Sequence, residues 1–196
     1  MIWAMILAAG ESTRMGKPKL LLPFGNKTII ETIIDKVISS KADKILVVLG
    51  SSREKIEEKI KKYPLEITVN PDFKRGMLSS VQRGFKALPE NTQAVMVLLG
   101  DQPAISTAIL DKIIHAYQTA KKGIILPVYK KERGHPVLID LKYKGEVESL
   151  SHEIGLRGLV YGHPEDIMEV KVKTASILKD IDYLEDYQKE LAKNKE

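Results

Sequence analysis

The sequence predicts a three-layer α/β/α domain built on a mainly parallel β-sheet. Short apolar runs alternate with longer segments of helical periodicity along the 196 residues, which is typical of a parallel sheet covered by helices. One run, residues 94–99, is apolar at every position, as expected for a strand buried on both faces. No internal repeat or low-complexity linker interrupts the pattern, so residues 1–196 are expected to form a single domain, long enough to bury a full core.

Strands are expected where four to eight residues, mostly apolar, lie between turn or helix signals. In chain order they cover residues 2–7, 44–49, 65–69, 94–99, 124–128, 136–139 and 167–172. A loop running to about Gly25 follows the first strand, the turn-forming residues 70–72 follow the third, and the polar segment 129–135 joins the fifth to the sixth.

Helices are expected where apolar residues recur at spacings of three and four. In chain order they cover residues 27–39, 53–62, 77–88, 106–119, 146–162 and 183–193. The first carries five aliphatic side chains on one face, the second is mostly charged, and the fourth begins with Ser106 as a plausible N-cap. Gly155 and Gly158 are expected to break the fifth helix.

Composition excludes several classes of site. The chain has no cysteine, which excludes disulfides, thiolate metal sites and a cysteine nucleophile. A metal would need oxygen or imidazole ligands, and oxygen favours Mg²⁺. The net charge is +5, but lysines alternate with glutamates, as in residues 53–59, which favours a solvated helix face over a nucleic-acid surface. Because no apolar run approaches the ~20 residues of a membrane span and no secretory signal is recognisable, we expect a cytoplasmic protein.

A loop suited to phosphate binding follows the first strand. Ala8, Ala9 and Gly10 are small, so backbone N–H groups can approach an anion closely. Arg14 and Lys19 add a forked cation and a point charge, which suit a triphosphate. The loop lies at the carboxyl end of its strand, where open α/β sheets bind ligands. It has neither the P-loop nor the dinucleotide spacing, and an ordinary basic surface loop remains the alternative.

The loop also resembles that of a known family. The pattern Ala8-Ala9-Gly10-x-Ser12-x-Arg14-Met15-Gly16, followed by Lys19 and Leu21-Leu22-Pro23, is similar to the signature loop of the MobA-like nucleotidyltransferases. The resemblance implies a Rossmann-like sheet of the nucleotide-diphospho-sugar transferase type. It also implies that the loop, with Ala8, Ala9, Gly10, Ser12 and Gly16 as nucleotide-binding residues, wraps the triphosphate, and that Arg14 and Lys19 contact phosphate oxygens as catalytic residues.

Within this family the chain is most similar to molybdenum cofactor cytidylyltransferases, which attach CMP to molybdopterin. Relatives that use GTP tend to have glycines and an Asp-Lys pair in the loop. Here Ala8-Ala9 and Pro18-Lys19 stand instead, which favours CTP.

Two carboxylates are candidates for a metal site. Asp101 follows the buried strand at 94–99 within Gly100-Asp101-Gln102-Pro103. At that edge Mg²⁺ could bridge phosphate oxygens, although the same residues suit an ordinary strand-to-helix turn. The segment resembles the family's Gly-Asp-x-Pro metal motif, with Gln102 in place of the usual Met. Residues 180–186 resemble its C-terminal Asp-Ile-Asp segment, which implies Asp182 as second ligand; an acidic helix start is the alternative.

Further resemblances imply the base and acceptor sides. Residues 70–81 resemble a family stretch near the base, which makes Gly76 and Ser80 nucleotide-site candidates; helix capping is the alternative. His135 precedes a proline and is therefore locally extended, and it matches the acceptor-side Gly-His-Pro segment. Arg157 lies in a looser match and is a candidate for an acceptor phosphate.

The resemblance implies Mg²⁺-dependent transfer of CMP from CTP to the phosphate of molybdopterin, with release of pyrophosphate. Two alternatives stay open. The same chemistry could act on another phosphorylated acceptor, such as a sugar or alcohol phosphate, or with GTP, because the match is weakest over residues 142–178. A non-catalytic nucleotide-binding accessory protein for a molybdoenzyme is the second. The expected partners are an NTP, molybdopterin and a molybdoenzyme that receives the cofactor, with no nucleic acid and no membrane.

Overall fold

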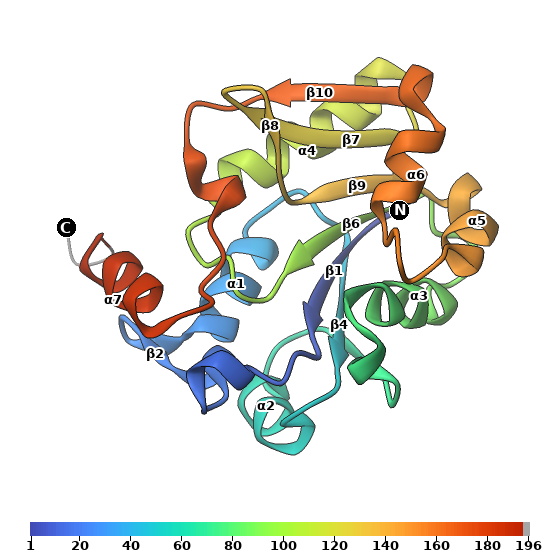
Figure 1. Ribbon diagram of the computed structural model, residues 1–196. Helices are drawn as coiled ribbons and strands as arrows, with labels where there is room; N and C mark the ends of the chain where they lie inside the picture. The colour runs from blue at the N-terminus through green and yellow to red at the C-terminus, as the bar shows by residue number, and fades with distance from the viewer. Residues whose placement is uncertain (194–196) are drawn as a thin grey trace.

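The computed structural model describes residues 1–193, and its central sheet has the strand order β10-β7-β9-β6-β1-β4-β5, with β8 paired to β7 (Figure 1). Within this sheet β9 and β8 are antiparallel to their neighbours, and the other pairs are parallel. The bounds of the sheet strands are β1 (Ile2–Ala8), β4 (Lys44–Leu49), β5 (Glu66–Val69), β6 (Ala94–Leu99), β7 (Ile124–Tyr129), β8 (Glu132–Arg133), β9 (Val137–Asp140) and β10 (Ile167–Lys171). A separate hairpin is formed by β2 (Pro23–Phe24) and β3 (Lys27–Thr28).

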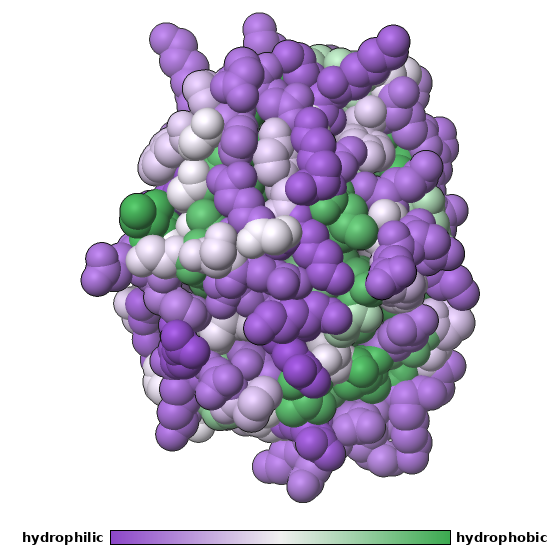
Figure 2. Space-filling view, turned by 90° about the vertical axis from the view of Figure 1, so that its right-hand side faces the viewer, coloured by the Kyte–Doolittle hydropathy of each residue, from purple (hydrophilic) through white to green (hydrophobic). Residues whose placement is uncertain are grey.

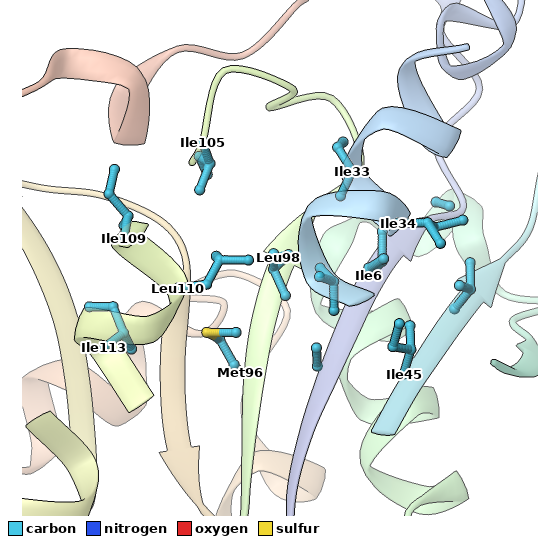
Figure 3. Packing of buried hydrophobic residues seen from close by; sticks show 14 of the residues in the cluster. Ile6, Ile33, Ile34, Ile45, Met96, Leu98, Ile105, Ile109, Leu110 and Ile113 are labelled. Carbon is cyan, nitrogen blue, oxygen red and sulfur yellow. The ribbon is translucent and has the colours of Figure 1, made fainter. Parts of the chain in front are cut away.

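Helices cover both faces of the sheet (Figure 1). They are α1 (Ile29–Ile38), α2 (Arg53–Ile60), α3 (Met77–Ala87), α4 (Thr107–Ala120), α5 (Lys144–Ser149), α6 (Arg157–Gly162) and α7 (Leu184–Lys193). Side chains alternate between the faces of a strand, so β1 divides the core. Ile6 packs with residues of α1, α2 and α4, whereas Met5 packs with residues of α3, α5 and α6. Figure 3 shows the first cluster, where Ile33 and Ile34 of α1 and Leu110 of α4 meet the central strands.

Local chemistry fixes the start of α1. The Thr28 side chain accepts a hydrogen bond from the Glu31 backbone N–H, and the Glu31 carboxylate accepts one from the Thr28 backbone N–H. This reciprocal capping box satisfies two N–H groups that have no partner inside the helix. The aliphatic face of α1 is buried, as its periodicity predicts.

The predicted fold class is confirmed, and the helix predicted at residues 146–162 is broken as expected, but over residues 150–156 rather than at both glycines. Residues 146–162 form two short helices, α5 and α6, separated by seven residues. The side-chain amide of Gln82 donates to the carbonyl oxygens of Val147, Glu148 and Leu150, which satisfies the carbonyl groups at the end of α5. Gly155 has a positive φ of 69° within the break, whereas Gly158 lies inside α6.

The surface is mostly polar. Figure 2 shows hydrophilic side chains over most of the face that it displays, with apolar side chains in small separate patches. Within residues 1–193, none of the helices combines the length and the apolar character that crossing a membrane requires.

Candidate nucleotide and metal site

The loop after β1 folds back on itself. Ser12 and Gly16 both have left-handed backbone angles, with φ of 54° and 63°, on either side of the short 3-10 helix Thr13–Met15. The Ser12 hydroxyl accepts a hydrogen bond from the Lys19 backbone N–H at 3.2 Å. This turn brings the Lys19 side chain back towards the end of β1.

Four charged side chains from three segments meet at this end of the sheet. The Lys19 ammonium lies 2.6 Å from Asp101 Oδ2 and 3.0 Å from Asp182 Oδ1. The Arg14 guanidinium lies 2.5 Å from Asp182 Oδ2 and stacks over the Tyr183 ring at 5.6 Å. The structure therefore brings Arg14, Lys19, Asp101 and Asp182 into one cluster of contacting groups.

Backbone contacts hold these segments in place. Strands β1 and β6 are parallel neighbours, so their carboxyl ends share one edge, and the Gly100 N–H donates to the Leu7 carbonyl at 2.9 Å. A Cβ at Gly100 would lie 2.6 Å from that carbonyl oxygen, which explains the glycine before Asp101.

The C-terminal segment is tied to the same edge. The Ile181 N–H donates to the Asp101 carbonyl at 3.0 Å, and the buried Gln102 amide donates to Asp180 Oδ1 at 2.6 Å. Figure 1 shows this segment descending to α7 beside the loop that follows β6. These two bonds place Asp182 opposite Lys19.

Burial and neighbouring charges shift the pKa values of Asp101 and Lys19. Burial raises the pKa of Asp101 above its ordinary value, and the nearby Lys19 ammonium only partly opposes this. For Lys19 burial lowers the pKa, but the carboxylates of Asp101 and Asp182 outweigh it, so the pKa is raised overall. Lys19 is therefore a cation at neutral pH.

The residues present fit a Mg²⁺ ion that is bound partly through substrate. Asp101 Oδ1 is buried and accepts no hydrogen bond within the described chain, which leaves one carboxylate oxygen for another ligand. Residues 1–193 contain no group of three or more His, Cys, Asp and Glu side chains that could hold a metal. Mg²⁺ commonly uses one or two carboxylates together with substrate phosphates and water, and Asp101 and Asp182 match that pattern.

Two cavities meet at Asp101. The first, of about 230 Å³, is lined by Leu7, Ala8, Gly10, Ser12, Thr13, Arg14, Lys19, Leu20, Asp101 and Asp182. The second, of about 300 Å³, is lined by Leu7, Ala9, Gly10, Phe73, Gly76, Met77, Ser80, Leu99, Gly100, Asp101 and Asp180. The first is lined by two cations, two carboxylates and several small residues, and with a metal on the carboxylates it suits a triphosphate. The second has a larger apolar share of lining and suits a ring.

Three predicted site residues lie outside both linings. Gly16 ends the 3-10 helix of the loop and so has a structural place there. His135 is partly buried, and burial lowers its pKa although the Asp101 charge opposes this. Arg157 is exposed at the start of α6. The structure does not bring Arg157 to the cluster.

Sequence reasoning missed several cavity residues. Phe73 and Met77 line the second cavity beside the predicted Gly76; both lie inside the motif at residues 70–81, and that was the available signal. Asp180 also faces this cavity, whereas Asp182 lines the first. Nothing in the sequence indicated that Gln102 binds Asp180.

Comparisons with known proteins identify the family of this chain. Residues 4–167 match the model described as "MobA-like NTP transferase domain". The chain is 30% identical over 184 residues to molybdenum cofactor cytidylyltransferase of Escherichia coli (strain K12), covering 93% of this chain and 92% of that one. It is 26% identical over 193 residues to nicotine blue oxidoreductase of Paenarthrobacter nicotinovorans, covering 94% and 93%.

Among solved structures, Rv0371c from Mycobacterium tuberculosis H37Rv superposes with a TM-score of 0.88 at 26% identity, covering 97% of both chains. The same protein in complex with manganese gives a TM-score of 0.83 at 25% identity, covering 97% of this chain and 98% of that one.

Proposed function

Because the chain belongs to the MobA-like NTP transferase family and is a nucleotidyltransferase, we propose that it transfers CMP from CTP to the terminal phosphate of molybdopterin and releases pyrophosphate. The observation that carries this proposal is the convergence of Arg14, Lys19, Asp101 and Asp182 at the carboxyl end of β1 and β6. The likeness to the Escherichia coli cytidylyltransferase supports the choice of CTP and molybdopterin.

The metal would be held by Asp101 and Asp182. The manganese complex of Rv0371c supports a divalent ion in this fold, and oxygen ligands support Mg²⁺. When bound, the ion would offset the negative charge of the phosphate oxygens that the acceptor must approach.

The chain's own residues act mainly by positioning and charge. Lys19 and Arg14 would exchange carboxylate partners for phosphate oxygens and stabilise the charge that develops on the leaving pyrophosphate. Backbone N–H groups at Ala8, Ala9 and Gly10 would hold the triphosphate. The base would occupy the second cavity, between Gly76 and Ser80.

The bond-making step needs no general base. A phosphate oxygen of the acceptor attacks the α-phosphorus, the bond to the β-phosphate oxygen breaks, and pyrophosphate leaves in line. A phosphate monoester is already ionised at neutral pH, so the step depends on alignment of two anions. His135, through its match to the family's acceptor-side segment, would contact the acceptor.

Two observations keep a second acceptor class open. Over nearly its whole length the chain also resembles a protein named nicotine blue oxidoreductase, and Arg157, the candidate for an acceptor phosphate, lies outside both cavities. The same transfer to a different acceptor, or from GTP, is therefore the alternative function.

A pyrophosphate-release assay tests the proposal. The protein is given CTP, GTP or ATP with Mg²⁺, each with and without molybdopterin. Release with CTP that requires molybdopterin is expected. Release that is faster with GTP overturns the choice of base, and failure of molybdopterin to act as acceptor overturns the choice of acceptor. Nucleotide binding without any release would point to the accessory-protein function, in which the chain serves a molybdoenzyme without turnover.

A further inference from the structure

A separate basic cavity lies between α1, the loop after β6 and α7. It has a volume of about 320 Å³ and shares no lining residue with the two cavities of the nucleotide site. Its lining consists of Phe24, Lys36, Pro103, Ala104, Thr174, Ser176, Lys179, Glu190 and Lys193.

The cavity carries an excess of positive charge. Three of its lining residues are lysines and one is a glutamate, so the formal charge of the lining is +2. The Glu190 carboxylate is 10% exposed and lies 2.5 Å from the Lys193 ammonium and 3.7 Å from that of Lys179. One carboxylate therefore serves two cations and leaves no negative charge for the third, Lys36.

Lys36 is the distinctive group of this cavity. Within residues 1–193 its ammonium has one hydrogen-bond partner, the Pro103 carbonyl oxygen, and no carboxylate within ion-pair distance. An ammonium has three donors, so two remain. Burial lowers the pKa of Lys36, and no nearby negative charge opposes it. A partly buried cation without a counter-charge is unfavourable, and an anion in the cavity would supply that charge.

The walls of the cavity belong to the segments that carry the site carboxylates. Pro103 lies two residues after Asp101, and Lys179 precedes Asp180, which accepts the hydrogen bond from Gln102. An anion that bridges Lys36 and Lys179 would therefore join α1 to both segments behind the nucleotide site.

We infer that this cavity is a binding site for a phosphate-type oxyanion, held by the Lys36 and Lys179 ammonium groups and separate from the triphosphate cavity. Free phosphate and the pyrophosphate that the proposed reaction releases share the required chemistry. The anion site is formed by residues that the proposed nucleotidyl transfer does not use. A negative result for one proposal therefore does not decide the other.

Amide NMR on the full chain tests this inference. The protein is titrated with inorganic phosphate, and in a second series with pyrophosphate, against sodium chloride of equal ionic strength. The amides of Ala104 and Ser176 report on the basic cavity, and those of Gly10 and Ser12 report on the triphosphate loop. Saturable shifts at Ala104 and Ser176 with phosphate support a site for the free ion. Such shifts with pyrophosphate alone support a site for the product. Absence of such shifts with both anions overturns the inference.

Matched lysine variants locate the contact. Lys36→Met and Lys179→Met should each weaken the apparent affinity at least about tenfold, since a hydrogen bond to a charged group is lost. Lys122→Met is the control, because that exposed ammonium donates to the Glu165 carbonyl at 2.5 Å and lines a different cavity. Wild-type affinity in both test variants contradicts the inference. Lys179 is 46% exposed, so its variant keeps the test valid if Lys36→Met does not fold.

Discussion

Replacing Asp101 by Asn separates the chemical role of this carboxylate from its place in the fold. The substitution removes one negative charge and keeps the size of the side chain. In the structure Asp101 Oδ2 pairs with Lys19 at 2.6 Å, and Oδ1 is buried without a partner. If Asp101 holds the metal beside the triphosphate, the variant should lose at least about a hundredfold in turnover, because charge stabilisation at the reacting phosphates is lost.

The same structure indicates a small effect on stability. Burial raises the pKa of Asp101, so its charged form is held at a cost that the Asn side chain does not have. Loss of the Lys19 ion pair opposes this gain, while Lys19 keeps its contact with Asp182 at 3.0 Å. We expect the free energy of unfolding to change by less than about 1 kcal/mol.

Asp166→Asn is the matched control. Asp166 accepts hydrogen bonds from the Tyr143 hydroxyl at 2.6 Å and pairs with Lys142 at 2.7 Å, at the start of β10 and hence at the opposite edge of the sheet. Burial alone would raise its pKa, but these two contacts lower it to about 2. This variant should lose about 1–2 kcal/mol of stability and keep its turnover.

The two variants are compared by pyrophosphate release with CTP, molybdopterin and Mg²⁺ and by urea unfolding at pH 7. A loss of turnover in Asp101→Asn with a loss of stability in Asp166→Asn is the expected pattern. Release by Asp101→Asn within threefold of wild type refutes the metal role, because a ligand to the reacting centre cannot be dispensable.

Three further outcomes follow from other parts of the structure. Burial would raise the pKa of Glu31, but hydrogen bonds from Lys62 and Thr28 lower it from 4.5 to about 2. The contribution of the ionised Glu31 carboxylate to stability is therefore complete above pH 4.5 and is lost as the pH falls towards 2. Glu31→Gln should lower the free energy of unfolding by on the order of 2 kcal/mol at pH 7, and urea curves in which this difference persists at pH 2 contradict the assignment. Gly50→Ala would place a Cβ 2.8 Å from the Ala9 carbonyl oxygen and should weaken CTP binding and stability by about 1–3 kcal/mol. Gly145→Ala, which lies in α5 with open space around it, should be neutral or stabilising. Both variants are compared by calorimetry, and equal effects contradict the packing argument. EDTA should abolish pyrophosphate release and leave Tm unchanged, because residues 1–193 contain no metal site built from protein ligands alone; a fall in Tm would show a structural ion instead.

Periodicity predicted most of the elements because the longer helices α1, α3 and α4 each bury one apolar face against the sheet. The aliphatic spacing in residues 27–39 corresponds to α1, and the fully apolar run at residues 94–99 corresponds to the central strand β6. The antiparallel placement of β9 between β6 and β7 could not be predicted, because an apolar run contains no information on the direction of its neighbour. A break in the helix at residues 146–162 was predicted from its glycines, but its position was not, since the Gln82 amide, which is distant in the sequence, binds the carbonyl groups at the end of α5.

The site was predictable where a motif lies at a strand end. Parallel strands end at one edge, so the loop after β1 and Asp101 after β6 had to be close, and the Lys19–Asp101 contact has that origin. The orientation of Asp180 towards the second cavity could not be predicted from the sequence. It depends on the hydrogen bonds of Asp180 with Gln102 and of Ile181 with Asp101, residues that are far apart in the sequence. The roles of these residues in binding and turnover stay predictions.

The bond between the Ile181 N–H and the Asp101 carbonyl has a consequence for biosynthesis. During translation the phosphate loop and β6 leave the ribosome well before Asp182 does, so a nascent chain can assemble most of the sheet while one of its two acidic groups is still missing. The site would then be complete only after the segment that carries Asp182 has bound to the rest of the domain. A prematurely terminated product that ends before Asp182 would have the scaffold and half of the carboxylate pair.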